Sequence, residues 1–203
     1  MQNLINQLIS QGYLKSPEII EAFRTVKRKD FISQELQGQE TLNSPLPIGH
    51  GQTISQPLTV AFMFENLQPR KGQKILDVGS GSGWTTAMLA NIVGKSGKVY
   101  AIERIKELNE FGQNNVAKYK FNNVEFYNFD GYQGLKKYAP FDRIIVSAAV
   151  KEVPNALKEQ LVVNGRLVIP TANQDIRLVV KTDKNKYDEE IFPGFVFVPL
   201  IKD

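Results

Sequence analysis

The chain has 203 residues, of which 42% are hydrophobic and 23% charged, the composition of an ordinary globular domain. Its net charge of +4 is too small to indicate nucleic-acid binding, and its basic residues form no stripe with interleaved aromatic residues. Cysteine is absent, which excludes disulfides, thiolate metal sites and a cysteine nucleophile, and fits a reducing compartment. We expect a single domain over residues 1–203 with no metal.

The sequence also contains neither a predicted membrane span nor a predicted secretory signal. No run of about 18 apolar residues could span a membrane. The first residues lack the basic start and apolar centre of a secretory signal. The sequence therefore predicts a cytoplasmic protein without membrane or nucleic-acid partners, and we expect a monomer.

Two short helices are predicted at the N-terminus. Apolar residues recur at helical spacing between Leu4 and Ile9, and Gly12 ends this pattern. Ser16 and Pro17 then resemble an N-cap followed by proline at the first helical position. Both helices precede the rest of the fold, so we expect residues 1–35 to form a helical cap. The densest basic cluster, residues 24–29, is expected on a solvated helix end.

Residues 36–58 mix glycine, proline and small polar residues without any period, which predicts a loop. The segment is too apolar for a disordered linker, and a long ordered loop of this kind is often functional. An apolar helix at 58–67 follows.

From residue 59 onward we expect an α/β core in which strands and helices alternate. Strands are predicted at 74–78, 99–102, 124–129, 142–147 and 166–170, and helices at 84–93, 105–120 and 155–162. Alternating units of this kind form a mostly parallel, doubly wound sheet of the Rossmann-like type. Two more extended runs, 176–182 and 195–200, lack a helix between them, so we expect an antiparallel strand at the sheet edge.

The segment 75–83 indicates where a nucleotide-like ligand would bind. A short apolar strand leads into glycines at 79, 81 and 83 and then into a helix, which is how α/β sheets hold nucleotides. Glu103 ends the second strand, about 20 residues later, where such folds place a carboxylate for ribose hydroxyls. Asp130 ends the third strand and can accept from an adenine amino group. A turn-forming role for the Asp130-Gly131 pair is equally compatible with the sequence.

Glu103, Asp130 and the glycine loop together favour a ligand that contains adenosine but no pyrophosphate. Asp77 adds negative charge beside the loop, which would oppose a phosphate and favour a cation. S-adenosylmethionine carries a sulfonium and an ammonium, so it fits better than NAD. The alternative is a glycine-rich turn in a domain without a ligand.

The chain resembles the protein-L-isoaspartate O-methyltransferase family over nearly its whole length. The most specific match is the segment 46–57, LPIGHGQTISQP, and the glycine loop, Ile102-Glu103-Arg104, Asp130-Gly131 and Val198-Pro199-Leu200 continue it. The resemblance implies methyl transfer from S-adenosylmethionine to the free carboxylate of isoaspartyl residues in damaged proteins and peptides. S-adenosylhomocysteine is the other product, and the ester then closes to a succinimide without the enzyme.

The resemblance also implies site residues. Ser55 would be the catalytic-site hydroxyl, and cofactor contacts would come from Gln52, Thr53, Ile54, Ser55, Asp77, Gly79, Ser80, Gly81, Glu103, Arg104, Asp130 and Gly131. Two departures stand out: Phe129 replaces a glycine usual in the family, and residues 171–174 contain no glycine where the family is glycine-rich.

The chemistry needs no general base, because an α-carboxyl group with a pKa of about 3.3–3.7 is already ionised at neutral pH. Ser55 could orient the acceptor carboxylate or cap the helix that begins near Pro57, or do both. His50, the single histidine, receives no proton-transfer role. Two alternatives stay open: a carboxyl methyltransferase for a specific modified peptide or small acid, and a non-catalytic module that binds adenosine ligands or damaged protein.

Overall fold

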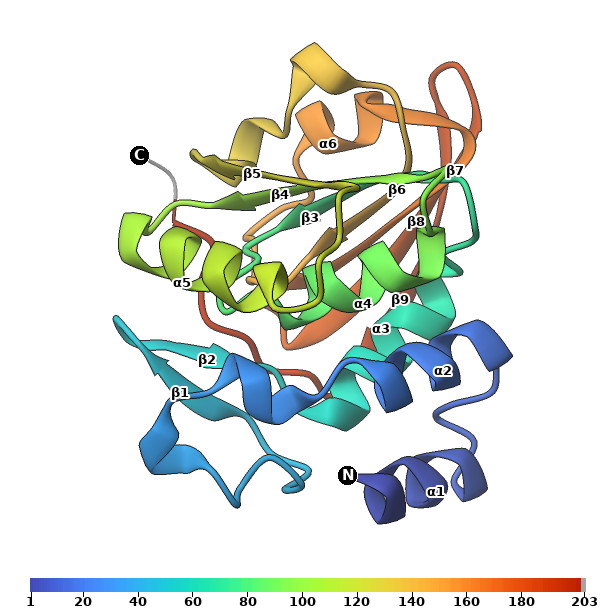
Figure 1. Ribbon diagram of the computed structural model, residues 1–203. Helices are drawn as coiled ribbons and strands as arrows, with labels where there is room; N and C mark the ends of the chain where they lie inside the picture. Colours follow the sequence, from blue (N-terminus) through green and yellow to red (C-terminus); the bar gives the residue numbers. More distant parts are fainter. Residues whose placement is uncertain (202–203) are drawn as a thin grey trace.

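Seven strands form one mixed sheet in the order β5-β4-β3-β6-β7-β8-β9 (Figure 1). The computed structural model describes residues 1–201. The parallel strands are β3 (Lys74–Val78), β4 (Lys98–Glu103), β5 (Val124–Asn128), β6 (Phe141–Val146) and β7 (Leu161–Thr171). β8 (Asp175–Asp183) pairs antiparallel with β7, and β9 (Lys186–Pro193) pairs antiparallel with β8. The predicted Rossmann-like sheet with an antiparallel edge is confirmed.

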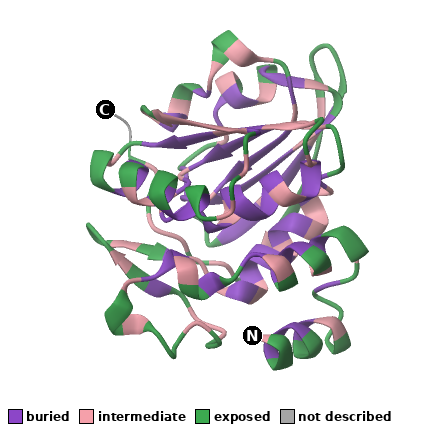
Figure 2. Ribbon diagram, in the orientation of Figure 1, coloured by how far each residue is buried: buried purple, intermediate pink, exposed green. Residues whose placement is uncertain are grey.

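Helices cover the two faces of the sheet unequally (Figure 1). One face carries α3 (Pro57–Leu67), α4 (Trp84–Val93) and α5 (Lys106–Ala117). The other carries the short α6 (Asn155–Glu159) and the 3₁₀ helices η3 (Gly131–Gln133) and η4 (Lys136–Tyr138). The central strands are buried between these layers (Figure 2). Their runs of branched apolar residues are therefore hydrophobic on both faces, as parallel strands require.

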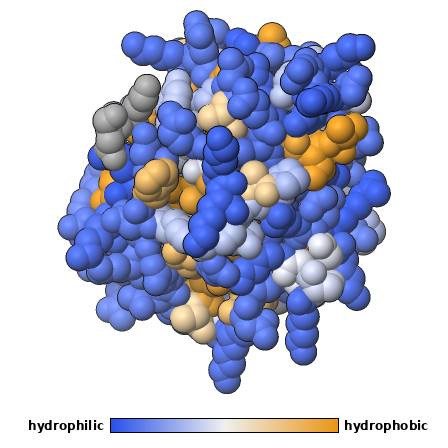
Figure 3. All heavy atoms as spheres, turned by 90° about the horizontal axis from the view of Figure 1, so that it is seen from above, coloured by the Kyte–Doolittle hydropathy of each residue, from blue (hydrophilic) through white to orange (hydrophobic). Residues whose placement is uncertain are grey.

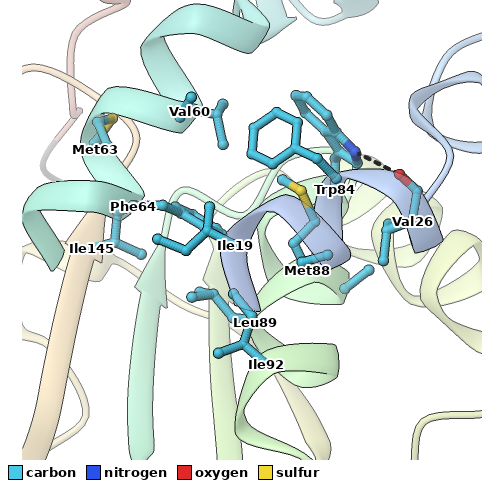
Figure 4. Close-up of a cluster of buried hydrophobic side chains, with 14 of the residues drawn as sticks. Ile19, Val26, Val60, Met63, Phe64, Trp84, Met88, Leu89, Ile92 and Ile145 are labelled. Carbon is cyan, nitrogen blue, oxygen red and sulfur yellow. Dashed lines mark hydrogen bonds between the residues drawn. The ribbon is translucent and has the colours of Figure 1, made fainter. Parts of the chain in front are cut away.

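The helical cap packs onto the α3 and α4 side of the sheet. It consists of α1 (Gln2–Ser10), α2 (Pro17–Thr25), η1 (Arg28–Phe31) and η2 (Gln34–Leu36). Figure 4 shows Ile19 of α2 beside Phe64 of α3. It also shows the Trp84 indole of α4 donating to the Val26 carbonyl, at 3.5 Å. The cap thus shares one hydrophobic core with the sheet. The N-cap expected at Ser16 is in place, but its hydroxyl donates to Glu65 at 2.7 Å instead of capping α2.

The prediction of an irregular loop over residues 36–58 is wrong in its centre. β1 (Leu46–Gly49) and β2 (Gln52–Ile54) form an antiparallel hairpin in which Leu46 pairs with Ile54. The strands are too short and too rich in proline and glycine to show alternation. Gly49, His50 and Gly51 make the turn with φ values of 89°, 54° and 70°.

Two predicted boundaries near the C-terminus are also wrong. The segment 195–200 is not the partner of β8, because β9 takes that place with an almost fully exposed acidic sequence. The apolar residues of 195–200 are instead used for packing, as Phe195 stacks on Phe62 with ring centroids 4.9 Å apart. The helix expected over 155–162 ends at Glu159, because Leu161 already begins β7.

The surface seen from above is mostly hydrophilic, with small separate hydrophobic patches (Figure 3). Across residues 1–201, every helix is too short or too polar to cross a bilayer.

Candidate active site at the carboxyl edge of the sheet

The glycine loop between β3 and α4 is held against the end of β4. The amides of Gly79 and Ser80 both donate to the Ile102 carbonyl, at 2.9 and 3.0 Å. Gly79, Gly81 and Gly83 all have positive φ, as the glycine pattern predicts. At Gly83 a Cβ would also lie 2.9 Å from the Gly112 carbonyl oxygen, so glycine is required for the close approach of α5.

Asp77 lies beneath this loop and is fully buried. Its Oδ2 accepts from the Thr85 and Thr86 hydroxyls at 2.9 and 2.6 Å. Its Oδ1 and the buried Ser80 hydroxyl find no hydrogen-bond partner among the described residues. Burial raises the pKa of Asp77 to about 6, against hydrogen bonds from both threonines that lower it. An ionised carboxylate with one unpaired oxygen is a suitable neighbour for a cationic ligand.

Glu103 is fixed at the end of β4 by two main-chain amides. Gly81 N–H donates to its Oε2 at 3.0 Å, and Ile105 N–H donates to its Oε1 at 2.9 Å. Each carboxylate oxygen has a second lone pair, so the side chain can accept from two more donors. The carboxylate therefore lies at the end of β4 beside the glycine loop, with acceptor positions left for a ligand.

The β1–β2 hairpin faces the glycine loop across a cleft. The side chain of Ile48 lies 3.1 Å from where a Cβ on Gly81 would be, which shows how closely the two segments approach. Ser55 follows β2 and lines the cleft. The α3 N-cap is Gln56, not Ser55, and the Ser55 hydroxyl makes no hydrogen bond to any residue within 1–201. The capping role considered for Ser55 is therefore wrong, and its hydroxyl is available to a ligand.

The cleft brings together most of the residues expected from the sequence. Ten of them line it: Gln52, Thr53, Ile54, Ser55, Gly79, Ser80, Gly81, Glu103, Arg104 and Gly131. Asp77 does not line the cleft, because it is buried under the glycine loop. It can act on a ligand only through the electrostatic field of its carboxylate. Asp130 does not line the cleft either. Its Oδ1 accepts from the Tyr132 amide at 2.8 Å, so the turn-forming role is present in the structure.

The sequence-based site omitted one whole wall, which is the C-terminal strap (residues 195–201). Val198 to Ile201 line the cleft. The strap is held by Ala149, whose N–H donates to the Val198 carbonyl and whose carbonyl accepts from the Leu200 amide, both at 2.7 Å. The resemblance of Val198-Pro199-Leu200 to the family is the signal in the sequence for this wall, whereas the apolar composition of 195–200 predicts an edge strand.

A second groove opens beside Ser55. It is lined by Pro45, Thr53, Ser55, Gln56, Thr59, Ser147 and Val196 to Val198. Four of these residues, Thr53, Ser55, Ser147 and Val198, also line the cleft. The second groove and the cleft therefore adjoin along these residues.

Arg28 anchors the segments on both sides of the β1–β2 hairpin through hydrogen bonds to their carbonyl groups. The expectation that residues 24–29 lie on a solvated helix end fails here, because Arg28 is only 1% exposed. Its guanidinium donates to the carbonyl groups of Leu42, Ser44 and Ser55 at 2.9, 2.7 and 3.1 Å. It also lies over the Trp84 ring, 5.5 Å from the centroid. Burial lowers the pKa of Arg28 to about 10, so the group stays charged at neutral pH.

The remaining candidate groups stay outside the site. His50 is exposed at the tip of the hairpin turn and does not line the cleft. Residues 1–201 contain no cluster of three histidine or carboxylate side chains that could hold a metal.

The raised pKa of Asp77 predicts a pH-dependent stability. Between its unfolded value of 3.8 and about 6, the folded state binds more protons than the unfolded state, so this group destabilises the fold progressively as pH rises through that window. From pH 5 to pH 8 the loss is roughly 1 kcal/mol. We expect Asp77→Asn to gain about 2–4 °C in melting temperature relative to wild type when the pH rises from 5 to 8.

Thermal melts of both proteins at the two pH values measure this difference. Asp142→Asn serves as the control, since that carboxylate is half-buried at the opposite end of the sheet and accepts from the Lys74 amide. A constant offset between wild type and Asp77→Asn at all pH values would contradict the expected titration.

Comparisons with known proteins agree with this geometry. The chain matches the profile of the family described as protein-L-isoaspartate(D-aspartate) O-methyltransferase over residues 1–203. It is 43% identical over 206 residues to the protein-L-isoaspartate O-methyltransferase of Ignicoccus hospitalis, covering 100% of this chain and 97% of that protein. Identity to the Methanopyrus kandleri enzyme of the same name is 42% over 204 residues, covering 98% and 90%.

A solved structure is similar over the same extent. It is described as a protein-L-isoaspartate O-methyltransferase from Plasmodium falciparum in complex with S-adenosyl-L-homocysteine. The TM-score is 0.89 at 27% identity, and the alignment covers 99% of this chain and 98% of that one. On the profile match and the curated relatives together, the chain belongs to the protein-L-isoaspartate(D-aspartate) O-methyltransferase family.

Proposed function

We propose that this protein transfers a methyl group from S-adenosylmethionine to the free α-carboxylate of L-isoaspartyl residues in damaged proteins and peptides. The observation that carries this function is that the cleft and the second groove share Ser55 among their lining residues, in a chain of this family. S-adenosylmethionine supplies an electrophilic methyl group. The residues of the chain have to bind it, align the acceptor and exclude water.

We infer that the cofactor lies along the carboxyl ends of β3, β4 and β5. Glu103 would hold the ribose, because both of its oxygens are fixed and each can accept once more. The main chain at Gly79 to Gly81 would surround the amino-acid part. Asp77, with its unpaired Oδ1 below the loop, would favour the positive charge of that part. Gln52 to Ser55 and the strap would close the cleft from the hairpin side.

Ser55 is proposed to orient the acceptor carboxylate. An oxygen of that carboxylate attacks the methyl carbon, a C–O bond forms, and the C–S bond breaks with its electrons left on sulfur. The negative charge on the acceptor disappears in this step, so a hydrogen bond to it is stronger before the transition state than in it. The hydroxyl therefore contributes through binding and alignment, and a proton acceptor is not needed.

Ser55→Ala is expected to lower kcat/KM for an isoaspartyl peptide about tenfold. A hydrogen bond to a charged group contributes about 1.5 kcal/mol or more. Most of the change should be in KM of the peptide, for the reason given above. S-adenosylhomocysteine affinity, measured by calorimetry, should remain close to that of wild type. Thr41→Ala is the control, because Thr41 is exposed and does not line the cleft. A loss confined to cofactor binding would contradict the acceptor role.

The function is tested with a pair of peptides that differ only in an isoaspartyl or a normal aspartyl residue. Methyl transfer to the first and none to the second is expected. Small acids and single modified peptides are assayed in parallel, because the glycine-free segment 171–174 departs from the family pattern. Turnover of one of those and not of the isoaspartyl peptide would point to a different carboxylate acceptor, and cofactor binding without any turnover would point to a binding module.

We also propose that residues 1–203 act as one domain, that the protein works as a monomer and that it is cytoplasmic. The shared core of cap and sheet supports the first. The scatter of exposed hydrophobic residues over separate elements supports the second. The absence of cysteine fits the third. Light scattering of the purified protein tests the monomer.

A further inference from the structure

Phe129 is an exposed aromatic residue at the mouth of the cofactor cleft. Its side chain is 51% exposed, yet it lines the cleft. It follows β5 directly, and its amide donates to the Glu103 carbonyl at 3.2 Å. The register of the two strands pairs Glu103 with Asn128, so Phe129 lies one residue beyond the ribose-binding acid on the neighbouring strand. Its backbone does not need the glycine usual in the family, because its φ is not positive.

The order of the strands assigns this position to the adenine end of the cofactor. β3, β4 and β5 are adjacent, and the glycine loop, Glu103 and Phe129 follow them in that order. Neighbouring strands lie about 4.8 Å apart, so an adenosine whose amino-acid part lies over β3 and whose ribose lies over β4 extends its base over the end of β5. Phe129 and Gly131 are the β5-side lining residues at that end.

The acid expected to bind adenine uses one of its oxygens in a local turn. Asp130 Oδ1 accepts from the Tyr132 amide, and the residue does not line the cleft. Phe129 does line the cleft at this strand end. Ile105 lines it from the β4 side and adds a second apolar side chain to this part of the cleft. Stacking of a base on an aromatic side chain contributes about 1–3 kcal/mol.

We propose that Phe129 is a cofactor-binding residue that stacks on the adenine ring of S-adenosylmethionine and S-adenosylhomocysteine. It thereby supplies affinity that the family's glycine at this position cannot supply. The inference rests on the proposed placement of the cofactor. It goes beyond that placement, because it assigns recognition of the base to an aromatic face at the sheet edge and not to a carboxylate alone.

Binding of S-adenosylhomocysteine, measured by calorimetry, tests the proposal without catalysis. Phe129→Leu and Phe129→Gly are expected to weaken binding about 5- to 150-fold, which is the range that stacking implies. Phe129→Tyr keeps the ring and should bind within about twofold of wild type. Folding is not at risk, because half of the side chain is already in water. Ile191→Ala is the matched control, since Ile191 is 53% exposed on β9 and does not line the cleft.

A ligand lacking the base separates stacking from indirect effects. S-ribosylhomocysteine keeps the ribose and homocysteine of the product but carries no adenine, and its affinity is measured by competition against S-adenosylhomocysteine. Wild type and Phe129→Leu should bind it equally, which isolates the interaction between ring and base. In turnover assays the variant should raise KM for S-adenosylmethionine and leave kcat nearly unchanged.

The outcomes are distinct. Wild-type affinity for S-adenosylhomocysteine in both Phe129→Leu and Phe129→Gly overturns the proposal while leaving the cofactor assignment intact. An equal loss of affinity for S-adenosylhomocysteine and S-ribosylhomocysteine in Phe129→Leu also overturns the proposal, because the effect would then not involve the adenine base. Absence of binding in the wild-type protein itself would instead remove the cofactor assignment.

Discussion

Glu103→Ala is expected to weaken S-adenosylhomocysteine binding about 100-fold or more. The substitution removes the proposed acceptor of both ribose hydroxyls, and each hydrogen bond to a charged group contributes about 1.5–3 kcal/mol. It also leaves the amides of Gly81 and Ile105 without their acceptor, so the loop loses its fixed position. Calorimetry with the product measures the affinity, and circular dichroism checks that the fold is retained.

Glu103→Gln sharpens this test. The amide keeps one acceptor oxygen but places an NH₂ group against one of the two main-chain N–H donors, so it should bind nearly as weakly as the alanine variant. Glu107→Ala removes an exposed acid from the first turn of α5 and should leave affinity unchanged. Binding by Glu103→Gln at wild-type strength would contradict this expectation and show that the charge of Glu103 is dispensable for cofactor binding.

Arg28→Met is expected to lower stability by about 4 kcal/mol and to reduce methyl transfer more than tenfold. Its guanidinium bonds four carbonyl groups, those of Glu40, Leu42, Ser44 and Ser55. A buried polar group left without its partner costs about 1–3 kcal/mol, and water can replace only part of this set. For a chain of this length the melting temperature should fall on the order of 10 °C. The activity loss follows because Ser55 is no longer held at the junction of cleft and groove.

Fluorescence of Trp84 reports on the same change, because it is the only tryptophan and lies against Arg28. Arg28→Lys keeps the charge, but a single ammonium cannot reach all four carbonyls, so we expect an intermediate melting temperature and activity. Arg24→Ala removes an exposed base from α2 and should change neither. Full activity in Arg28→Met, measured at a temperature where it is folded, would show that the hairpin positions Ser55 without this anchor.

The α/β core could be predicted from the sequence because its signals are local. Buried parallel strands are continuous apolar runs, and each is followed by a helix with its own periodicity. The glycine loop and Glu103 were predicted for the same reason. A strand end, a turn and an acid at a fixed separation belong to one βαβ unit, and their relative positions follow from its geometry.

The features that were predicted wrongly depend on contacts between residues distant in sequence. β9 has no apolar alternation, since it is an edge strand with both faces largely exposed, and only pairing with β8 defines it. The strap has the apolar composition of a strand but is fixed by Ala149 and Phe62. Arg28 belongs to a basic cluster in the sequence, and its burial follows from four carbonyl groups supplied by a segment folded around it.

The sequence by itself determined the sheet, the adenosine ligand and, through resemblance, the methyl-transfer chemistry, because strand periodicity, glycine spacing and the segment 46–57 are all continuous in the chain. Only the tertiary structure decided how the site is completed. It brought Ser55, the strap and Phe129 to one cleft, buried Asp77 beneath the loop and paired one oxygen of Asp130 with the Tyr132 amide. Side-chain direction and burial depend on packing between distant segments, and no local pattern encodes them.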